Sequence, residues 1–223
     1  PRTLVDSGAR SNALMYSFFH WGLHPWAIYV LVGLSLSYFH FRRGLPLAPR
    51  SMLYPLIGNR IYGPIGHGTD ILCTVGTLFG VATSLGFGAQ QINAGLSQIS
   101  DLEFSITTQV ALITIITGFA TTSVLLGLHS GISVLSRINM VLAIALLLFV
   151  FVMGPTLSIV ENMVSSTGVY LQHLLETSFF IRPGETSQWQ RDYTLFYWSW
   201  WISWSPFVGV FTARISRGRT VRE

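Results

Sequence analysis

The chain has 223 residues, of which 50% are hydrophobic and 10% are charged. A soluble globular chain carries about 25% charged residues, so this one lacks the charge to cover a water-exposed surface. Its mean hydropathy of +0.52 indicates surface that faces lipid. The composition excludes an ordinary soluble globule and predicts an integral membrane protein.

The charged residues and the cysteine content exclude two further classes. All 13 basic residues are Arg, and they are not gathered in one patch with interleaved aromatic residues. The pI near 9.6 therefore does not indicate a nucleic-acid partner. Cys73 is the only cysteine, so an internal disulfide is excluded and we expect it to pack as a small apolar residue. Because the first residue is Pro1 rather than Met, we expect an internal segment of a longer protein.

Five stretches of the chain contain no Asp, Glu or Arg and are long enough to cross a bilayer. A charge at the bilayer centre costs about 2.5 to 3.5 kcal/mol, and a helix needs roughly 20 residues to cross the hydrocarbon. The predicted spans are 15–41, 71–97, 105–128, 138–160 and 193–213. Their apolar runs do not alternate with polar residues. We therefore predict an all-α integral membrane protein with one membrane domain over residues 1–223.

The distribution of Arg orients these spans. With the N-terminus outside, the inner segments hold nine of the 13 Arg, and the acidic residues divide the other way. Positively charged loops stay in the cytoplasm. We expect a multi-pass protein of the inner (plasma) membrane, with its N-terminus outside and its C-terminus cytoplasmic. The outer stretch 163–178 is too short to span, and we predict an interfacial helix there, with ordinary loop packing as the alternative.

The tryptophans fall mainly in two clusters, one in the first span and one in the fifth. The first cluster is Trp21, Trp26 and Tyr29, the second is Trp198, Trp200, Trp201 and Trp204, and Trp189 lies in the outer loop. Tyr29 precedes Arg42 by 13 residues and Trp201 precedes Arg214 by 13, so each lies about 20 Å from the inner boundary. Membrane Trp normally anchors at the interface, which is the ordinary interpretation of Trp21. Trp201 lies deeper, and we expect the clusters to meet.

The fifth span also contains Pro206. Its missing N–H predicts a broken helix, and backbone groups released at membrane depth favour a transport site. Several aromatic faces without an acidic side chain inside the spans suit a cation that needs no hydrogen-bond acceptor. A quaternary ammonium group is such a cation, and each desolvated cation–π contact contributes about 2 kcal/mol.

The segments around both clusters resemble the signature segments of a known family. Residues 20–29 read HWGLHPWAIY, residues 200–209 read WWISWSPFVG, and residues 213–220 read ARISRGRT. These segments are similar to those of the betaine/choline/carnitine transporters. The resemblance implies a twelve-helix transporter with a five-plus-five inverted-repeat core, of which the five spans would be the fourth to the eighth. It also implies osmoprotective import of choline or glycine betaine by symport, no cofactor and a homotrimer.

The resemblance assigns roles to individual residues. Those that are similar to the family's aromatic box around the trimethylammonium group are Trp21, Trp26, Tyr29 and Trp201. By the same resemblance, Trp200 and Trp204 would border the substrate path. The family's glycine-rich helix, which would face a substrate carboxylate, should precede Pro1.

The resemblance leaves the coupling ion open between sodium and a proton. Sodium-coupled betaine carriers of the family place two hydroxyl side chains one turn apart in the second span, where this chain has Thr77 and then Val81. Valine offers no oxygen to Na⁺, so proton-coupled uptake fits at least as well. Thr77 and Phe207 are the positions that the resemblance carries over for ion coupling.

Two other functions compete with transport. His20 and His24 are four residues apart on one helical face, as metal ligands of a membrane oxidase would be, but the other four histidines are scattered singly. Such histidines more commonly bond to a neighbouring helix, so we expect a protein that is not an enzyme. A sensor or structural membrane protein without transport is the second alternative. It would not accumulate labelled betaine or choline in cells.

Overall fold

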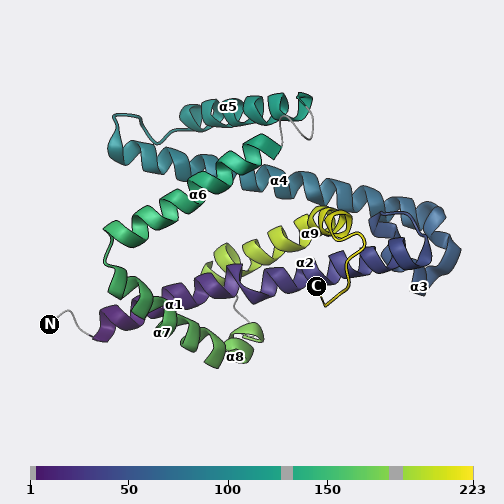
Figure 1. Cartoon of the computed structure of the whole chain (residues 1–223), viewed down its shortest axis with the longest axis horizontal. Helices are drawn as coiled ribbons and strands as arrows, with labels where there is room; N and C mark the ends of the chain where they lie inside the picture. The colour runs from purple at the N-terminus through teal and green to yellow at the C-terminus, as the bar shows by residue number, and fades with distance from the viewer. Residues whose placement is uncertain (1–3, 127–132, 181–187, 223) are drawn as a thin grey trace. The chain divides into compact units, whose positions relative to one another are not determined.

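The computed structural model describes residues 4–126, 133–180 and 188–222 (Figure 1). Within these ranges the chain forms helices without any strand, which confirms the predicted all-α fold. The longer helices are α1 (Leu4–Trp21), α2 (Leu23–Ser37), α4 (Pro64–Ile99), α5 (Ile106–Leu125), α6 (Ser133–Met153), α7 (Thr156–Gln172) and α9 (Phe196–Ile215). The short elements are η1 (Tyr38–Arg42), η2 (Pro49–Leu53), α3 (Tyr54–Ile57), η3 (Gly58–Tyr62), α8 (Leu174–Ser178) and η5 (Gln190–Leu195).

The chain divides into two compact units. The first consists of Pro1–Thr83 with Ser166–Glu223, and the second is Ser84–Ser165. Both aromatic clusters lie in the first unit, on α1, α2 and α9. The first unit therefore holds every residue of the predicted substrate site.

Among the described residues, four helical segments are long and apolar enough to cross a membrane. They are Ala13–Arg42, Pro64–Ile99, Ile106–Leu125 and Ser133–Met153. Helix α9, which covers most of the predicted span 193–213, has 20 residues but is not among the four. Its tryptophans and serines lower its mean hydropathy, because indole and hydroxyl groups are less apolar than aliphatic side chains. The tryptophans of the predicted site thus lower the hydropathy by which a membrane-spanning helix is recognised.

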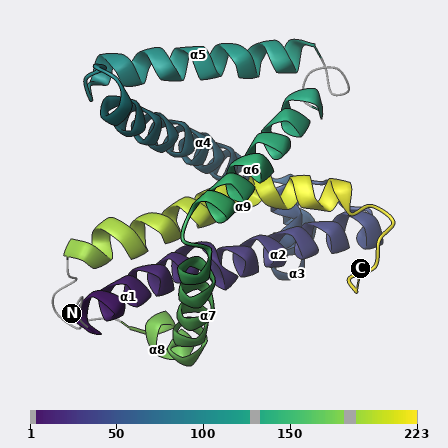
Figure 2. The ribbon, with the colours of Figure 1, turned by 60° about the vertical axis from the view of Figure 1, so that its left-hand side comes forward.

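Helices α2 and α9 pack closely and run in the same direction. Figures 1 and 2 both show them side by side. A Cβ atom built on Gly33 would lie 2.5 Å from the Thr212 hydroxyl oxygen, and one on Gly209 would lie 2.5 Å from Val32 Cγ1. Glycines at these two positions let the backbones approach, as small residues do at membrane helix interfaces. Parallel packing is the arrangement expected of a first and a fifth span.

The break between α1 and α2 lies inside the first aromatic cluster. Gly22 separates the two helices, and a Cβ on it would crowd the Phe18 carbonyl oxygen. Three residues later, Pro25 has no N–H to donate to the Trp21 carbonyl. Gly22 and Pro25 together explain why the helix stops and restarts at this level.

The predicted break at Pro206 is wrong, because α9 runs through this residue without interruption. Proline removes the N–H that would bond the carbonyl of Ile202, four residues earlier. The Ser205 hydroxyl donates to that carbonyl oxygen instead, at 2.8 Å. With this substitute donor, α9 loses one backbone hydrogen bond but continues without a break.

A break does occur inside the predicted span 138–160. Helix α6 ends at Met153, and α7 begins after Gly154 and Pro155. The Thr156 hydroxyl donates to the Phe151 carbonyl at 2.6 Å, which replaces the donor that Pro155 lacks. The predicted interfacial helix 163–178 falls on the second part of α7 and on α8.

In the second unit, Asn93 fixes the connection from α4 to α5. Its side chain is fully buried. It donates to the Glu103 carbonyl at 3.1 Å and accepts from the Ser105 N–H at 3.1 Å. Ser105 caps α5 by accepting from the N–H of Thr108. These bonds satisfy backbone groups at a helix end that would otherwise lack partners.

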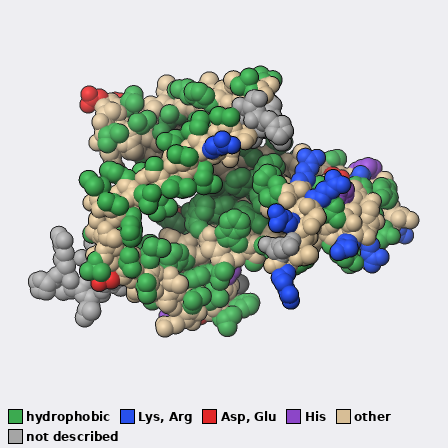
Figure 3. Space-filling view, in the orientation of Figure 1, with side chains coloured by type: hydrophobic (Ala, Val, Ile, Leu, Met, Phe, Trp, Pro, Cys, Tyr) green, Lys and Arg blue, Asp and Glu red, His purple; other side chains and the backbone are tan. Residues whose placement is uncertain are grey.

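Figure 3 shows apolar side chains over much of the visible surface and a group of Arg side chains around α3 and the end of α9. Arg42, Arg50 and Arg60 belong to η1, η2 and η3, and Arg214 lies in the last turn of α9. Arg50 forms an ion pair with Asp70, with 3.4 Å between Nε and Oδ2. These four arginines, which the charge pattern assigns to inner segments, therefore lie at one end of the first unit, whereas Arg137 belongs to α6 in the second unit.

We expect Gly209→Ala to destabilise the full-length protein by about 1 to 3 kcal/mol, the usual cost of overpacking. The new methyl group would clash with Val32, whose β-branched side chain has few alternative rotamers. Thermal unfolding in detergent would measure the change. Gly86→Ala is the matched control, because a Cβ at Gly86 meets nothing within 4 Å. Equal melting temperatures for the two variants would contradict the close α2–α9 contact.

Candidate functional site: an aromatic cluster between two parallel helices

The two predicted aromatic clusters touch across the α1–α2 and α9 interface. The ring centroids of Trp21 and Trp201 are 4.8 Å apart at an interplanar angle of 74°, and those of Tyr29 and Trp201 are 6.3 Å apart at 83°. Edge-to-face contacts of this kind are favourable because the positive edge of one ring meets the negative face of the other. The meeting of the clusters, predicted from residue counting, is confirmed.

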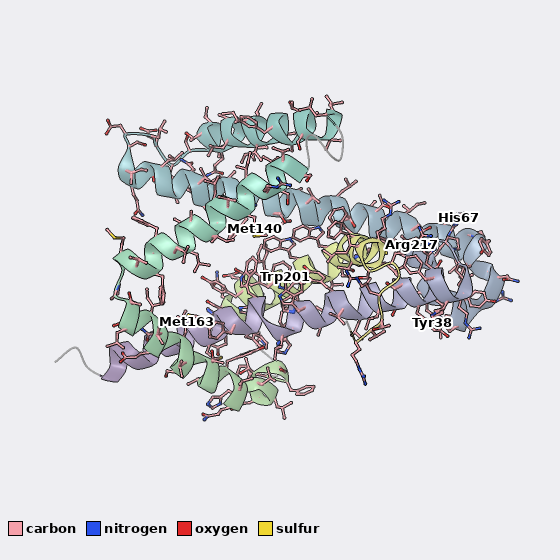
Figure 4. All side chains as sticks on the ribbon, viewed as in Figure 1. Tyr38, His67, Met140, Met163, Trp201 and Arg217 are labelled. Atoms are coloured by element: carbon pink, nitrogen blue, oxygen red, sulfur yellow. The ribbon has the colours of Figure 1, made fainter. Side chains whose placement is uncertain are left out.

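Trp201 is the centre of this contact and is only 3% exposed. Its indole Nε1–H donates to the carbonyl oxygen of His20 at 2.8 Å. The carbonyls of the last turn of α1 need partners from outside their own helix, because α1 ends at Trp21. The bond therefore satisfies a buried donor and a helix-end acceptor at once. Figure 4 shows Trp201 on α9 beside α2.

One face of α9 carries a stack of aromatic rings. Trp200 and Trp201 are stacked with centroids 4.7 Å apart, and Trp200 and Trp204 are stacked at 6.3 Å. Tyr197 continues the stack, 5.9 Å from Trp201. The four residues follow the spacing that places side chains on one helical face. Ring contacts with Trp200 and Tyr197 therefore restrict the movement of the Trp201 side chain.

The cluster has both open and buried parts. Trp21 and Trp26 are 50% and 62% exposed, whereas Tyr29 is 9% exposed. Trp26 stands perpendicular to Tyr29 with centroids 6.1 Å apart. The Tyr29 hydroxyl and the Trp204 Nε1–H are buried and have no hydrogen-bond partner among the described residues. The site thus offers open aromatic faces next to polar groups that can still bond a ligand.

The cluster is closed in this structure. A cation binds over an aromatic face within about 6 Å of the ring centroid. Trp21 and Trp201 stand edge to face at 4.8 Å, which leaves no room for a methylated ammonium group between them. The accessible faces are those of Trp21 and Trp26.

The predicted ion-coupling residues do not form part of this cluster. The Thr77 hydroxyl donates to the Cys73 carbonyl of its own helix at 2.8 Å. Val81 is 45% exposed and Phe207 is 52% exposed. Helix α4 does approach α9 at this level, because a Cβ on Gly80 would lie 3.3 Å from Trp204 Cβ. The role of Thr77 and Phe207 in ion coupling stays a prediction.

His20 and His24 bond to hydroxyl groups of neighbouring elements. His20 Nε2 lies 3.1 Å from Thr194 Oγ1, and His24 Nε2 lies 2.8 Å from Ser178 Oγ. The Tyr170 hydroxyl oxygen lies 3.5 Å from His24 Nδ1. Burial raises the pKa of the Tyr170 phenol, although a hydrogen bond with the Leu23 backbone opposes this shift. No group of three metal-binding side chains occurs in the described part of the chain. The geometry therefore gives the oxidase alternative no support.

Two features of the site were not predicted from the sequence. His20 joins α1 to α9 by its carbonyl bond to Trp201 and a ring stack on Tyr197 at 4.9 Å, and to η5 by its contact with Thr194. The helix break at Gly22 is the second feature. Gly22 and Pro25 are residue types that indicate a helix break. A backbone acceptor such as the His20 carbonyl cannot be predicted from residue types, because every residue has a carbonyl.

Comparison with known proteins identifies close relatives. The sequence profile of the family described as "BCCT, betaine/carnitine/choline family transporter" matches residues 3–223. The chain is 48% identical over 223 residues to the glycine betaine transporter of Acinetobacter baylyi, covering 100% of the chain and 33% of that protein. It is 48% identical over 214 residues to the glycine betaine transporter OpuD of Bacillus subtilis, with 95% and 42% covered.

A third relative is named for another solute. The chain is 47% identical over 219 residues to the high-affinity choline transport protein of Escherichia coli, covering 96% of the chain and 32% of that protein. The chain thus spans between 32% and 42% of the length of these three relatives.

We expect Trp201→Phe to lower the stability of the full-length protein by about 1 to 3 kcal/mol, the cost of leaving a buried polar group unpaired. Phenylalanine keeps an aromatic ring on α9 but cannot donate to the His20 carbonyl. Thermal unfolding in detergent would measure the loss. Phe211→Leu, at a position that is 55% exposed on the same helix, is the control. A Trp201→Phe protein as stable as this control would show that the bond contributes nothing.

Proposed function

The chain belongs to the betaine/carnitine/choline transporter family, and from this we propose that the full-length protein imports choline or glycine betaine, driven by an ion gradient. Membership makes the chain part of a multi-pass membrane transporter rather than an enzyme. The observation that carries the proposal for the substrate is the aromatic contact between α1–α2 and α9 around Trp201.

Quaternary ammonium chemistry suits these side chains. A methylated nitrogen carries charge but no N–H donor, so aromatic faces can replace its weakly held water. A primary amine in the same place would leave its donors unsatisfied, which costs free energy at a buried site. The site residues that we propose to contact the substrate or its path are Trp21, Trp26, Tyr29, Trp200, Trp201 and Trp204.

Substrate entry requires the cluster to open, and Trp21 is the side chain that we propose to move. It stands edge to face against Trp201 at 4.8 Å and against Trp200 at 5.9 Å, yet half of its surface is exposed. Gly22, at the break between α1 and α2, follows it directly. Trp201 is held by its hydrogen bond to His20 and by the α9 stack. A half-exposed ring that faces a buried, hydrogen-bonded ring supports the proposed alternation between closed and open forms.

The unpartnered hydroxyl of Tyr29 supports a second contact. It is buried and finds no hydrogen-bond partner among the described residues. The hydroxyl of choline or the carboxylate of glycine betaine can accept from it, which would satisfy the donor in the loaded state. Both solutes appear in the names of relatives of this chain.

We propose either sodium or a proton as the coupling ion. Sodium requires oxygen ligands, and the Thr77 hydroxyl hydrogen is already donated to Cys73. Its oxygen can still coordinate an ion, but Val81, one turn later, offers none. A proton does not need that pair of oxygens. Thr77 and Phe207 remain the proposed positions for the ion.

We also propose a membrane orientation and an oligomeric state. The full-length protein would lie in the inner (plasma) membrane with the start of this chain outside and its end in the cytoplasm, and it would form a homotrimer. The Arg group around α3 and the end of α9 supports a cytoplasmic position for that end. A sensor without transport activity is the alternative, and it would not accumulate labelled choline or glycine betaine in cells.

Trp201→Ala in the full-length protein should weaken substrate binding by about 1 to 3 kcal/mol while membrane insertion is unchanged. The ring supplies an aromatic wall of the site, whereas insertion depends on the apolar length of the spans. Uptake of labelled choline and glycine betaine over a range of concentrations would give KM. Phe211→Ala serves as the control on the same helix. Identical KM values in the two variants would remove Trp201 from the substrate site.

Val81→Thr should increase the sodium dependence of uptake, because it supplies the second oxygen one turn after Thr77. Initial uptake rates at a series of sodium concentrations, at fixed pH, would measure the shift. Val75→Thr adds a hydroxyl at another exposed position of α4 and is the matched control. The same sodium response in both variants would exclude Thr77 from ion coupling.

A further inference from the structure

Helix α7 contacts both sides of the break between α1 and α2. Tyr170 of α7 is 5% exposed and packs in one buried cluster with Met15 and Phe19 of α1. On the other side of the break, the Tyr170 hydroxyl oxygen lies 3.5 Å from Nδ1 of His24 in α2. A Cβ atom built on Gly22, between the two helices, would lie 3.7 Å from the same hydroxyl. The Tyr170 side chain therefore lies against α1, the break and α2 together.

The proton on the His24 ring can be located from its hydrogen-bond partners. His24 Nε2 lies 2.8 Å from the hydroxyl oxygen of Ser178 in α8. The Ser178 hydroxyl donates its only hydrogen to the carbonyl of Leu174 in the same helix. Its oxygen can then only accept, so His24 Nε2 carries a hydrogen and donates it to Ser178.

The opposite nitrogen of the ring meets the Tyr170 hydroxyl. The hydroxyl oxygen accepts a hydrogen bond from the Leu23 backbone, which leaves its hydrogen free to point at His24 Nδ1. In the neutral ring Nδ1 is an acceptor, because the hydrogen is on Nε2. A continuous hydrogen-bond chain results, in which every donor has an acceptor. Its members, in order, are the Leu23 backbone, Tyr170, His24, Ser178 and the Leu174 carbonyl.

Protonation of His24 would interrupt this hydrogen-bond chain. Nδ1 would become a donor, and the hydrogen of the Tyr170 hydroxyl would lose its acceptor. A buried hydroxyl without a partner costs free energy, and so does a charge placed among apolar side chains. At 3.5 Å, the contact between His24 and Tyr170 is longer and therefore weaker than the 2.8 Å contact between His24 and Ser178. A charged His24 ring would thus loosen the link between α2 and α7.

The groups that face His24 do not favour its charge. The titratable groups are His20, one turn earlier on α1, and Tyr170 of α7. Helix α9 contributes the Trp198 ring, which carries no charge and stacks on His24 with centroids 5.4 Å apart. Glu176, the acidic residue of α8, bonds a different histidine. A proton on His24 therefore gains no ion pair among the described residues, and His20 opposes it when charged.

Water can bring a proton close to His24. The His24 side chain is half-buried, and its ring meets the Phe19 ring with centroids 4.6 Å apart. Phe19 lines a cavity of about 420 Å³ between α1, α7, α8 and η5. A cavity of this volume has room for several water molecules. His24 can therefore respond to pH while the protein stays folded.

We propose that neutral His24 is a positioning residue that holds α7 and α8 against the α1–α2 break, and that its protonation in mildly acidic solution releases the break. Trp21, the ring that stands against Trp201, directly precedes Gly22 at this break. The hydrogen-bond chain therefore limits the movement of Trp21 at neutral pH. This consequence for transport rests on the proposed function, whereas the release of the break does not.

Hydrogen–deuterium exchange of the full-length protein in detergent tests the release without any substrate. The measured quantity is the exchange rate of a peptide covering residues 20–28, divided by that of a peptide from α5, a helix without titratable side chains. The division cancels the effect of pH on intrinsic exchange, which is common to all amides. Between about pH 7.5 and about pH 5 we expect the ratio to rise about three- to fivefold, as for the loss of one hydrogen bond.

Two substitutions separate the titration of His24 from a loss of structure. His24→Gln keeps a side-chain N–H for Ser178 but cannot be protonated, so its exchange ratio should be the same at both pH values. Tyr170→Phe keeps the buried ring and removes the hydroxyl, so its ratio at about pH 7.5 should already reach the acidic wild-type value. The matched controls are His20→Gln and His173→Gln, and both should retain the wild-type response.

Three results would overturn the proposal. One is a wild-type exchange ratio that is the same at both pH values, and another is a full pH response in the His24→Gln protein. The third is a response that His20→Gln abolishes and His24→Gln retains, which would assign the titration to His20. Failure of the proposed function alone looks different, because Trp201→Ala would then leave choline uptake unchanged while the exchange ratio still depended on His24.

Discussion

The hydrogen bond from the Trp201 indole to the His20 carbonyl is the interaction on which the candidate site depends. It joins the last turn of α1 to the second turn of α9 at 2.8 Å, in surroundings where Trp201 is only 3% exposed. An unpaired indole N–H and an unpaired carbonyl would each be costly there. One bond satisfies both groups and thereby favours the observed position of the ring against the first aromatic cluster.

The glycine contact between α2 and α9 makes that bond geometrically accessible. Gly33 and Gly209 allow the backbones to approach to a distance that larger residues would prevent. The parallel course of the helices then brings equivalent depths together along their whole contact. A site built on two closely packed helices is stiff, which suits Trp201, whereas Trp21 stands at the end of α1 and is half exposed. The fold therefore combines a buried, hydrogen-bonded ring with a half-exposed one.

Pro155 and Pro206 affect their helices differently, although both lack a backbone N–H. Pro155 lies at a real break between α6 and α7, but α9 continues through Pro206. In both places a neighbouring hydroxyl, from Thr156 or Ser205, donates to the carbonyl that proline leaves unbonded. The hydroxyl alone does not decide whether the helix breaks. Gly154 adds backbone freedom beside Pro155, whereas the close contact with α2 holds α9 at Pro206.

Much of the fold followed from the sequence by itself. Charge-free lengths predicted the long apolar helices, because an ionised group at membrane depth is costly whatever its neighbours are, and the orientation derived from the Arg distribution stays a prediction. Residue counting set the common depth of Tyr29 and Trp201, because the rise of a helix per residue is constant. The tertiary structure alone decided that Trp21 closes on Trp201, that His20 supplies a carbonyl acceptor, and that a cavity forms between α1 and α8. These features arise from contacts between distant segments, and their geometry depends on the rotation and separation of helices, which residue types do not encode.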